Sequence, residues 1–157
     1  MAGLLVLGLG NQLMSDDAIG VVVARRLLKW PISGVSIAAG GTPGYGLLDL
    51  LSTHHGVVFI DAVDAGNASG AVFWVEPESI LRERNRQSLH QVGLADVLAL
   101  MAVAGEMPWV RIIGVQPQHI GAGTKLSGAL RRRLPIITSK AAEMVADCAN
   151  LARPAPA

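Results

Sequence analysis

Cysteine, aromatic residues and charge are all scarce in this sequence. Cys148 is the only cysteine, which excludes a disulfide within the chain and a zinc site built from several cysteines. Charged residues make up 16% and aromatic residues 4% of the 157 residues, whereas 51% are apolar. A chain of this length and composition can bury a core without a disulfide or structural metal. We therefore expect a single domain over residues 1–152 and a frayed tail over residues 153–157.

No stretch of the sequence suits a transmembrane helix. The longest uncharged stretch, residues 30–48, is interrupted by two prolines and five glycines. No basic residue precedes the apolar run at residues 4–7, so we expect no signal peptide and a cytoplasmic protein. The net charge of +1 predicts no strong attraction of the whole molecule to nucleic acid or membrane.

Short apolar runs alternate with segments of helical spacing along the chain. Strands are predicted at residues 4–7, 35–38, 57–60, 71–75 and 110–115. Helices are predicted at residues 18–28, 45–51, 91–104, 125–133 and 136–151, the last two separated by Pro135, and residues 78–86 are expected to form a charged surface segment. This order predicts a three-layer α/β/α sandwich around a five-stranded, mostly parallel, twisted sheet. One antiparallel pairing is expected between the third and fourth strands, because they are close in sequence.

Three titratable residues are expected at one edge of this sheet, where right-handed crossovers gather the loops that follow parallel strands. Asp17 follows the first strand, in a helix start that Ser15 is expected to cap and where Asp16 also lies. Asp61 follows the third strand, where an ionised carboxylate needs a partner or a cation. His90 opens a helix that returns over the same sheet. Asp17, Asp61 and His90 can therefore converge.

Two carboxylates and an imidazole suit zinc or nickel better than calcium or magnesium. Three ligands leave open positions at which a metal can polarise a carbonyl or activate water, so the set favours hydrolysis. Each residue also has an ordinary structural interpretation: a helix-start acid for Asp17, a turn acid for Asp61 and a capping residue for His90. Asp64 is a reserve candidate for proton transfer.

The remaining features carry weaker signals. The segment Gly8-Leu9-Gly10 lacks the third glycine of a dinucleotide-binding fingerprint. Of the other histidines, His54 and His55 are expected in a solvated turn, and His119 could approach the site edge. The tryptophans are expected in the core or an interface, and the arginines at 131–133 on a solvated helix face.

Six short motifs follow one another along nearly the whole chain: Gly8-Leu9-Gly10-Asn11, Asp16-Asp17-Ala18-Ile19-Gly20, Gly40-Gly41-Thr42, Asp61-Ala62-Val63-Asp64-Ala65-Gly66, Ser88-Leu89-His90-Gln91 and Gly114-Val115-Gln116-Pro117. In this ordered series the chain resembles the hydrogenase maturation endopeptidases. The resemblance implies an endopeptidase that removes the C-terminal peptide from the large-subunit precursor of a nickel-iron hydrogenase after nickel insertion, with the bound nickel as the recognition element.

The same resemblance implies roles for individual residues. It places the family's metal-binding acid on Asp17, its strand-end aspartate on Asp61 and its histidine on His90. The precursor would supply the nickel, so the free enzyme can lack it, and zinc or cadmium could replace it in a crystal.

Two departures from the family pattern keep other functions open. Members often carry Glu in place of Asp17 and commonly carry Asp where this sequence has Ala39. If that acid is required, the chain is a nickel-dependent maturation chaperone or sensor that binds the precursor without cutting it. A peptidyl-tRNA-hydrolase-like enzyme shares the first Gly-Leu-Gly-Asn turn, but Asp16 and Asp17 would repel an RNA phosphate.

Overall fold

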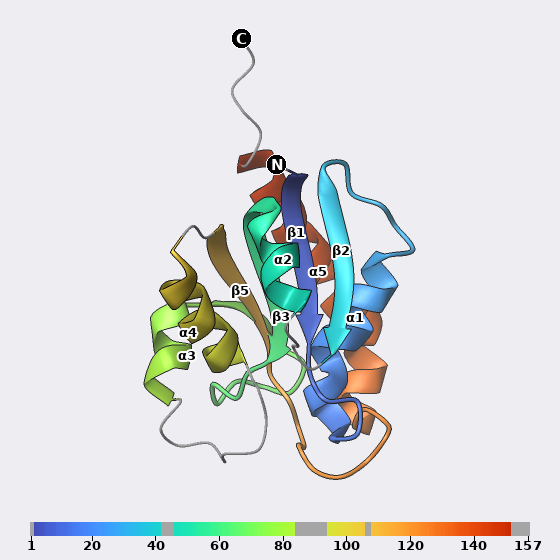
Figure 1. Cartoon of the computed structure of the whole chain (residues 1–157). Coiled ribbons are helices and arrows are strands. Elements are labelled where there is room, and N and C mark those ends of the chain that lie inside the picture. Colours follow the sequence, from blue (N-terminus) through green and yellow to red (C-terminus); the bar gives the residue numbers. More distant parts are fainter. Residues whose placement is uncertain (1, 42–45, 84–93, 106–107, 152–157) are drawn as a thin grey trace.

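A five-stranded sheet lies between two layers of helices (Figure 1). The computed structural model describes residues 2–41, 46–83, 94–105 and 108–151. The strands are β1 (Ala2–Leu9), β2 (Val35–Gly41), β3 (His54–Ala62), β4 (Val72–Val75) and β5 (Trp109–Val115), in the spatial order β2-β1-β3-β5-β4. All neighbours pair in parallel except β4 and β5. The predicted fold class is confirmed.

The antiparallel strand has a different partner from the one predicted. β4 pairs with β5 and not with β3. The reason is that β5 already occupies that side of β3 along residues 56–62, so β4 lies on the outer side of β5. Proximity in sequence therefore indicated the strand's direction but not its neighbour.

The helices divide between the two faces of the sheet. One face is covered by α1 (Ile19–Leu27), which continues the 3-10 turn η1 (Ser15–Ala18), and by α5 (Gly128–Leu151). The other face is covered by α2 (Gly46–Ser52), α3 (Pro77–Glu83) and α4 (Leu94–Ala104). Part of the segment expected as charged surface thus forms α3. Among the described residues, no helix is both long and apolar enough to cross a membrane.

Alternate side chains of the central strands enter opposite cores, as the two-residue period of a strand requires. In β1, Leu4 and Val6 pack with α1 and α5, whereas Leu5 and Leu7 pack toward α2 and α4. These four side chains are almost completely buried. Burial on both faces explains why the strand sequence is a continuous apolar run rather than an alternating pattern.

Two glycines allow α1 to rest directly on the sheet. A Cβ atom at Gly20, in α1, would overlap the carbonyl oxygens of Leu9 and Ile60. A Cβ atom at Gly8, in β1, would overlap the carbonyl oxygen of Gly20. This close approach brings the start of α1 onto the ends of β1 and β3.

Pro135 lies inside one continuous helix, α5, so the prediction of two helices around it was wrong. A proline in a helix interior costs about 3 kcal/mol. Leu130 and Ile137 lie on either side of Pro135 and are completely buried in the same core, while Pro135 itself is exposed. Burial of each such side chain contributes about 1.5–3 kcal/mol, which offsets the cost of the proline.

Three smaller expectations are also resolved. His54 is buried, with Nδ1 2.8 Å from the carbonyl oxygen of Leu50, so it does not lie in a solvated turn, whereas His55 is exposed. All three tryptophans are exposed rather than in the core, and the Arg111 guanidinium lies 4.9 Å from the ring centre of Trp74. The arginines at 131–133 are exposed on α5, as predicted. The tail at 153–157 lies outside the described residues.

Candidate functional site

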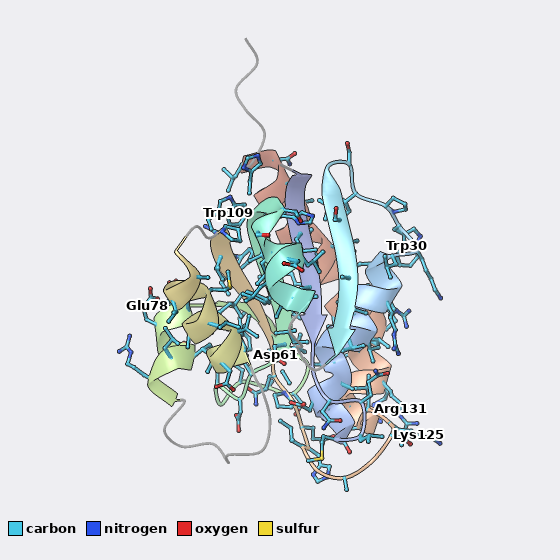
Figure 2. All side chains as sticks on the ribbon, viewed as in Figure 1. Trp30, Asp61, Glu78, Trp109, Lys125 and Arg131 are labelled. Carbon is cyan, nitrogen blue, oxygen red and sulfur yellow. The ribbon has the colours of Figure 1, made fainter. Side chains whose placement is uncertain are left out.

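The candidate site lies at the carboxyl edge of the four parallel strands. In Figure 2, Asp61 marks this lower edge and Trp109, at the start of β5, marks the opposite one. The loops that follow β1, β3 and β5 all reach this edge. The candidate acids Asp17 and Asp61 were predicted at this edge because the loops after parallel strands gather there.

Asp17 is positioned by a loop that folds back on itself. Its Oδ2 accepts a hydrogen bond of 2.8 Å from the backbone N–H of Asn11. Gly10 makes this return possible because its φ is 138°, and a Cβ atom there would overlap the carbonyl oxygen of Asp17. Asp17 thus sits on η1, which the close contact of Gly20 with the Ile60 carbonyl holds against β3.

Asp61 lies near the end of β3, opposite Gly114 of β5. Its Oδ1 accepts a hydrogen bond of 2.9 Å from the backbone N–H of Ala62. The residue keeps some exposed surface, but burial of its carboxyl group, and then the negative charge of Asp17, raise the pKa of Asp61 to about 8. The structure therefore brings Asp17 and Asp61 together as an acid pair, in which the Asp61 carboxyl is neutral in the free protein at neutral pH.

Asp16, the neighbour of Asp17, has a different environment. Its side chain is completely buried. Oδ1 accepts a hydrogen bond from the backbone N–H of Ser127 (2.7 Å), and Oδ2 accepts two from those of Gln118 (2.9 Å) and His119 (3.0 Å). Burial opposes ionisation, but these hydrogen bonds outweigh it and lower the pKa of Asp16. Asp16 therefore ties the first loop to the loop after β5, a role beyond the predicted helix-start acid.

Ser15 does not cap the helix, contrary to the prediction. The N-cap of η1 is Met14, which makes no side-chain capping bond. Ser15 has a φ of 52°, its Oγ donates to the carbonyl oxygen of Gly121 (2.9 Å), and its N–H donates to that of Gly123 (2.9 Å). Together with Asp16, Ser15 joins residues 13–16 to residues 119–127.

The loop after β3 is held by Gln116, which the sequence distinguishes only as part of the motif Gly114-Val115-Gln116-Pro117. Gln116 is buried, and its Nε2 donates a hydrogen bond of 2.9 Å to Oδ1 of Asp64. This bond, followed by one from the backbone N–H of Gly66, lowers the pKa of the exposed Asp64. No sequence signal marks the pair, because the two residues are 52 positions apart.

The third predicted ligand, His90, lies outside the described residues, as does Thr42 of the third motif. Within residues 2–41, 46–83, 94–105 and 108–151, no group of three His, Cys, Asp or Glu side chains is arranged to hold a metal ion. His119 is exposed in the loop that Asp16 holds at this edge. A divalent cation at the acid pair would offset the repulsion that Asp17 exerts on an ionised Asp61.

Curated relatives share most of the length of this chain. A hydrogenase expression/formation protein HupD from Thiocapsa roseopersicina is 35% identical over 156 residues, which is 96% of this chain and 71% of the relative. The hydrogenase 2 maturation protease of Escherichia coli K12 is 38% identical over 127 residues, 75% of this chain and 77% of the relative.

Solved structures and a family model agree with these relatives. The hydrogenase maturating endopeptidase HybD of Escherichia coli superposes with a TM-score of 0.76 at 29% identity, covering 92% of this chain and 93% of that one. Residues 22–144 match the HycI family model, described as hydrogenase maturation protease. The chain therefore belongs to the hydrogenase maturation protease family and is a peptidase.

Proposed function

We propose that this peptidase removes a C-terminal peptide from the large-subunit precursor of a nickel-iron hydrogenase after nickel has been inserted. In this proposal Asp17, Asp61 and His90 complete the coordination of nickel that the precursor carries in as part of the substrate. The observation that carries the proposal is the acid pair, because the charge of Asp17 acts on the carboxyl of Asp61 at the edge where α/β enzymes keep their sites.

The residues of the acid pair would act differently during docking. The Asn11 N–H orients the Asp17 carboxylate through Oδ2, and within the described part of the chain Oδ1 accepts no hydrogen bond, so that oxygen would be available to a cation. Asp61 holds a proton on its carboxyl group in the free protein at neutral pH, and this proton leaves when positive charge approaches. Docking therefore releases a proton, and two fixed carboxylates position the scissile region of the precursor. Bound nickel would supply Lewis-acid polarisation of a carbonyl.

A cleavage assay tests this proposal. The matched precursor, prepared with and without nickel, is incubated with the wild type and with the variants Asp17→Ala, Asp61→Ala and His90→Ala, and its C-terminus is read by mass spectrometry. We expect cleavage of the nickel-loaded precursor by the wild type and a loss of at least about 100-fold in each variant. Asp49→Ala, which removes an exposed acid from α2, is the matched control and retains activity.

The outcomes separate the proposal from its rivals. Undiminished cleavage without nickel, or by both the Asp17→Ala and His90→Ala variants, contradicts nickel recognition by these residues. Binding of the precursor without a change in its mass identifies a chaperone or sensor, which is the function that Ala39 kept open.

A further inference from the structure

The loop that follows β3 is anchored at both ends by one residue. The backbone N–H of Gln116 donates to the carbonyl oxygen of Ala71 (2.9 Å), and its carbonyl oxygen accepts from the N–H of Gly70 (2.8 Å). The side-chain Oε1 accepts from the N–H groups of Ala65 (2.9 Å) and Asn67 (3.1 Å). Gln116 therefore sets the path of the loop from residue 65 to residue 71.

The amide nitrogen of Gln116 extends this anchoring to a carboxylate. Its Nε2 donates to Oδ1 of Asp64 (2.9 Å) and to the carbonyl oxygen of Pro117 (3.3 Å). Only 5% of the surface of Gln116 is exposed, and both polar atoms of its side chain are used. A buried amide is tolerated only with such partners, so Gln116 is a rigid support.

Asp64, in contrast, is exposed. Its Oδ1 also accepts from the N–H of Gly66 (3.2 Å), and within the described part of the chain its Oδ2 has no partner. Holding one exposed carboxylate in place adds little to the stability of a protein. An oriented carboxylate with a free oxygen is instead typical of a preorganised binding group.

The position and charge of Asp64 fit a group that contacts substrate. It lies three residues after Asp61, in the loop that continues from the site edge. The hydrogen bond from Gln116 lowers the pKa of Asp64, which makes it a weaker base and keeps it anionic at neutral pH. These properties favour binding of a hydrogen-bond donor over proton transfer.

We propose that Gln116 is a positioning residue, which holds the Asp64 carboxylate in the loop after β3, at the same edge of the sheet as the acid pair, so that its free oxygen anchors a hydrogen-bond donor of the precursor polypeptide. This inference rests on the proposed function, because it needs a precursor that is cleaved. It concerns binding of the polypeptide and not of nickel. Its signature is therefore a change in KM with little change in kcat.

Three variants test the anchor by steady-state cleavage of the nickel-loaded precursor. Asp64→Asn keeps an acceptor for Gln116 and Gly66 but turns an amide donor toward the precursor, so we expect an unchanged Tm and a KM about tenfold higher. Gln116→Met keeps the charge of Asp64 but releases it, so we expect a similar rise in KM and a lower Tm. Asp147→Asn removes an exposed acid from α5 and, as the matched control, leaves KM unchanged.

The double variant Gln116→Met/Asp64→Asn distinguishes an effect of Gln116 that acts through Asp64 from an independent effect on the structure of the loop. If Gln116 acts through Asp64, the double variant has the KM of the single variants; independent effects would multiply to about 100-fold. A wild-type KM in Asp64→Asn, or multiplied effects, overturns the inference. If Gln116→Met does not fold, Gln116→Glu retains the acceptor for Ala65 and Asn67, repels Asp64 and is expected to raise KM. Failure of the wild type to cleave overturns the proposed function instead.

Discussion

The loops after β1 and β3 bring acids to the same edge of the sheet, but they are held in place in opposite ways. In the first loop a buried carboxylate, Asp16, accepts three backbone hydrogen bonds from the loop after β5. The second loop is held from outside by a buried amide. Gln116, which follows β5, forms hydrogen bonds with the backbone of this loop and with Asp64. In both cases one buried polar residue provides rigidity, and a more exposed carboxylate nearby remains available for chemistry.

This difference shows that adjacent, chemically identical residues can have separate tasks. Asp16 is saturated with hydrogen bonds and has a lowered pKa. The pKa of Asp61 is raised by burial and then by the charge of Asp17, the residue next to Asp16. The environment, and not the side chain, therefore distinguishes a structural acid from a candidate ligand.

Asp16→Asn should have the largest effect on stability. The amide cannot accept all three hydrogen bonds and turns a donor toward backbone N–H groups, so we expect a loss of about 3 kcal/mol in the free energy of unfolding. Asp17→Asn is the matched control and should change it by about 0.5 kcal/mol or less. Urea unfolding of both variants measures the difference, and equal losses would break the distinction between the two acids.

The pH dependence of stability also tests whether Asp16 has a structural role that Asp17 lacks. Since the pKa of Asp16 is lower in the folded state, its contribution is present above the unfolded pKa near 3.8 and is lost as the pH falls toward the folded value. The wild type should therefore lose more stability than Asp16→Asn on acidification below about pH 4. Parallel curves for the two proteins would contradict this.

Gly20→Ala tests whether the first loop depends on the helix that follows it. The added Cβ would overlap the carbonyl oxygens of Leu9 and Ile60, so α1 must shift from the sheet, and we expect a loss of about 2 kcal/mol. The same shift moves η1 and Asp17 away from Asp61 and should reduce cleavage. Gly128→Ala, where the Cβ would meet only the flexible Arg132 side chain, is the control and should not lower the thermal stability or the rate of cleavage.

Asp61→Asn should stabilise the free protein while abolishing cleavage. The pKa of Asp61 is raised to about 8, so its neutral form contributes stability below the unfolded pKa that is lost as the pH rises through about 8. An amide cannot ionise, so we expect the variant to be more stable than the wild type, by an amount that grows as the pH rises from about 5 to about 8. Denaturant unfolding from pH 5 to pH 9 measures this difference. If the variant has the pH profile of the wild type, the pKa of Asp61 is not raised in the folded protein.

Ser15→Ala should have the smallest effect. It removes the hydrogen bond from Oγ to the carbonyl oxygen of Gly121 and leaves the backbone bond to Gly123, so we expect a loss of about 1 kcal/mol. Ser52→Ala, which removes a hydroxyl bond of an exposed residue at the end of α2, should cost less. Differential scanning calorimetry compares the two, and a larger loss at Ser52 would show that the joined loops contribute little.

The sequence allowed prediction of the layered fold because the strands are buried on both faces and so appear as apolar runs bounded by turns. The edge that carries Asp17 and Asp61 followed from the handedness of parallel connections. The neighbour of β4 and the continuity of α5 through Pro135 did not follow, because packing between distant segments decided both.

The residues that support the loops were beyond sequence reasoning for a different reason. Ser15 and Asp16 bond to groups more than 100 residues away, and Gln116 bonds to groups about 50 residues away. Their partners are mostly backbone N–H and carbonyl groups, which nearly every residue carries. Such contacts leave no pattern of residue types, so a serine that resembled an N-cap was assigned the commoner role.

The contact between Gly8 and Gly20 has a consequence for selectivity. The backbone of α1 contacts the backbone of the sheet directly. The distance between β1 and the backbone of Asp17 is therefore set by backbone contact and not by the rotamers of intervening side chains. The position of the Asp17 carboxylate relative to the sheet is therefore adjusted through the two torsion angles of its own side chain. Under the proposed function, an aspartate at position 17 in place of a longer acid would therefore change the distance from the sheet at which a cation could bind.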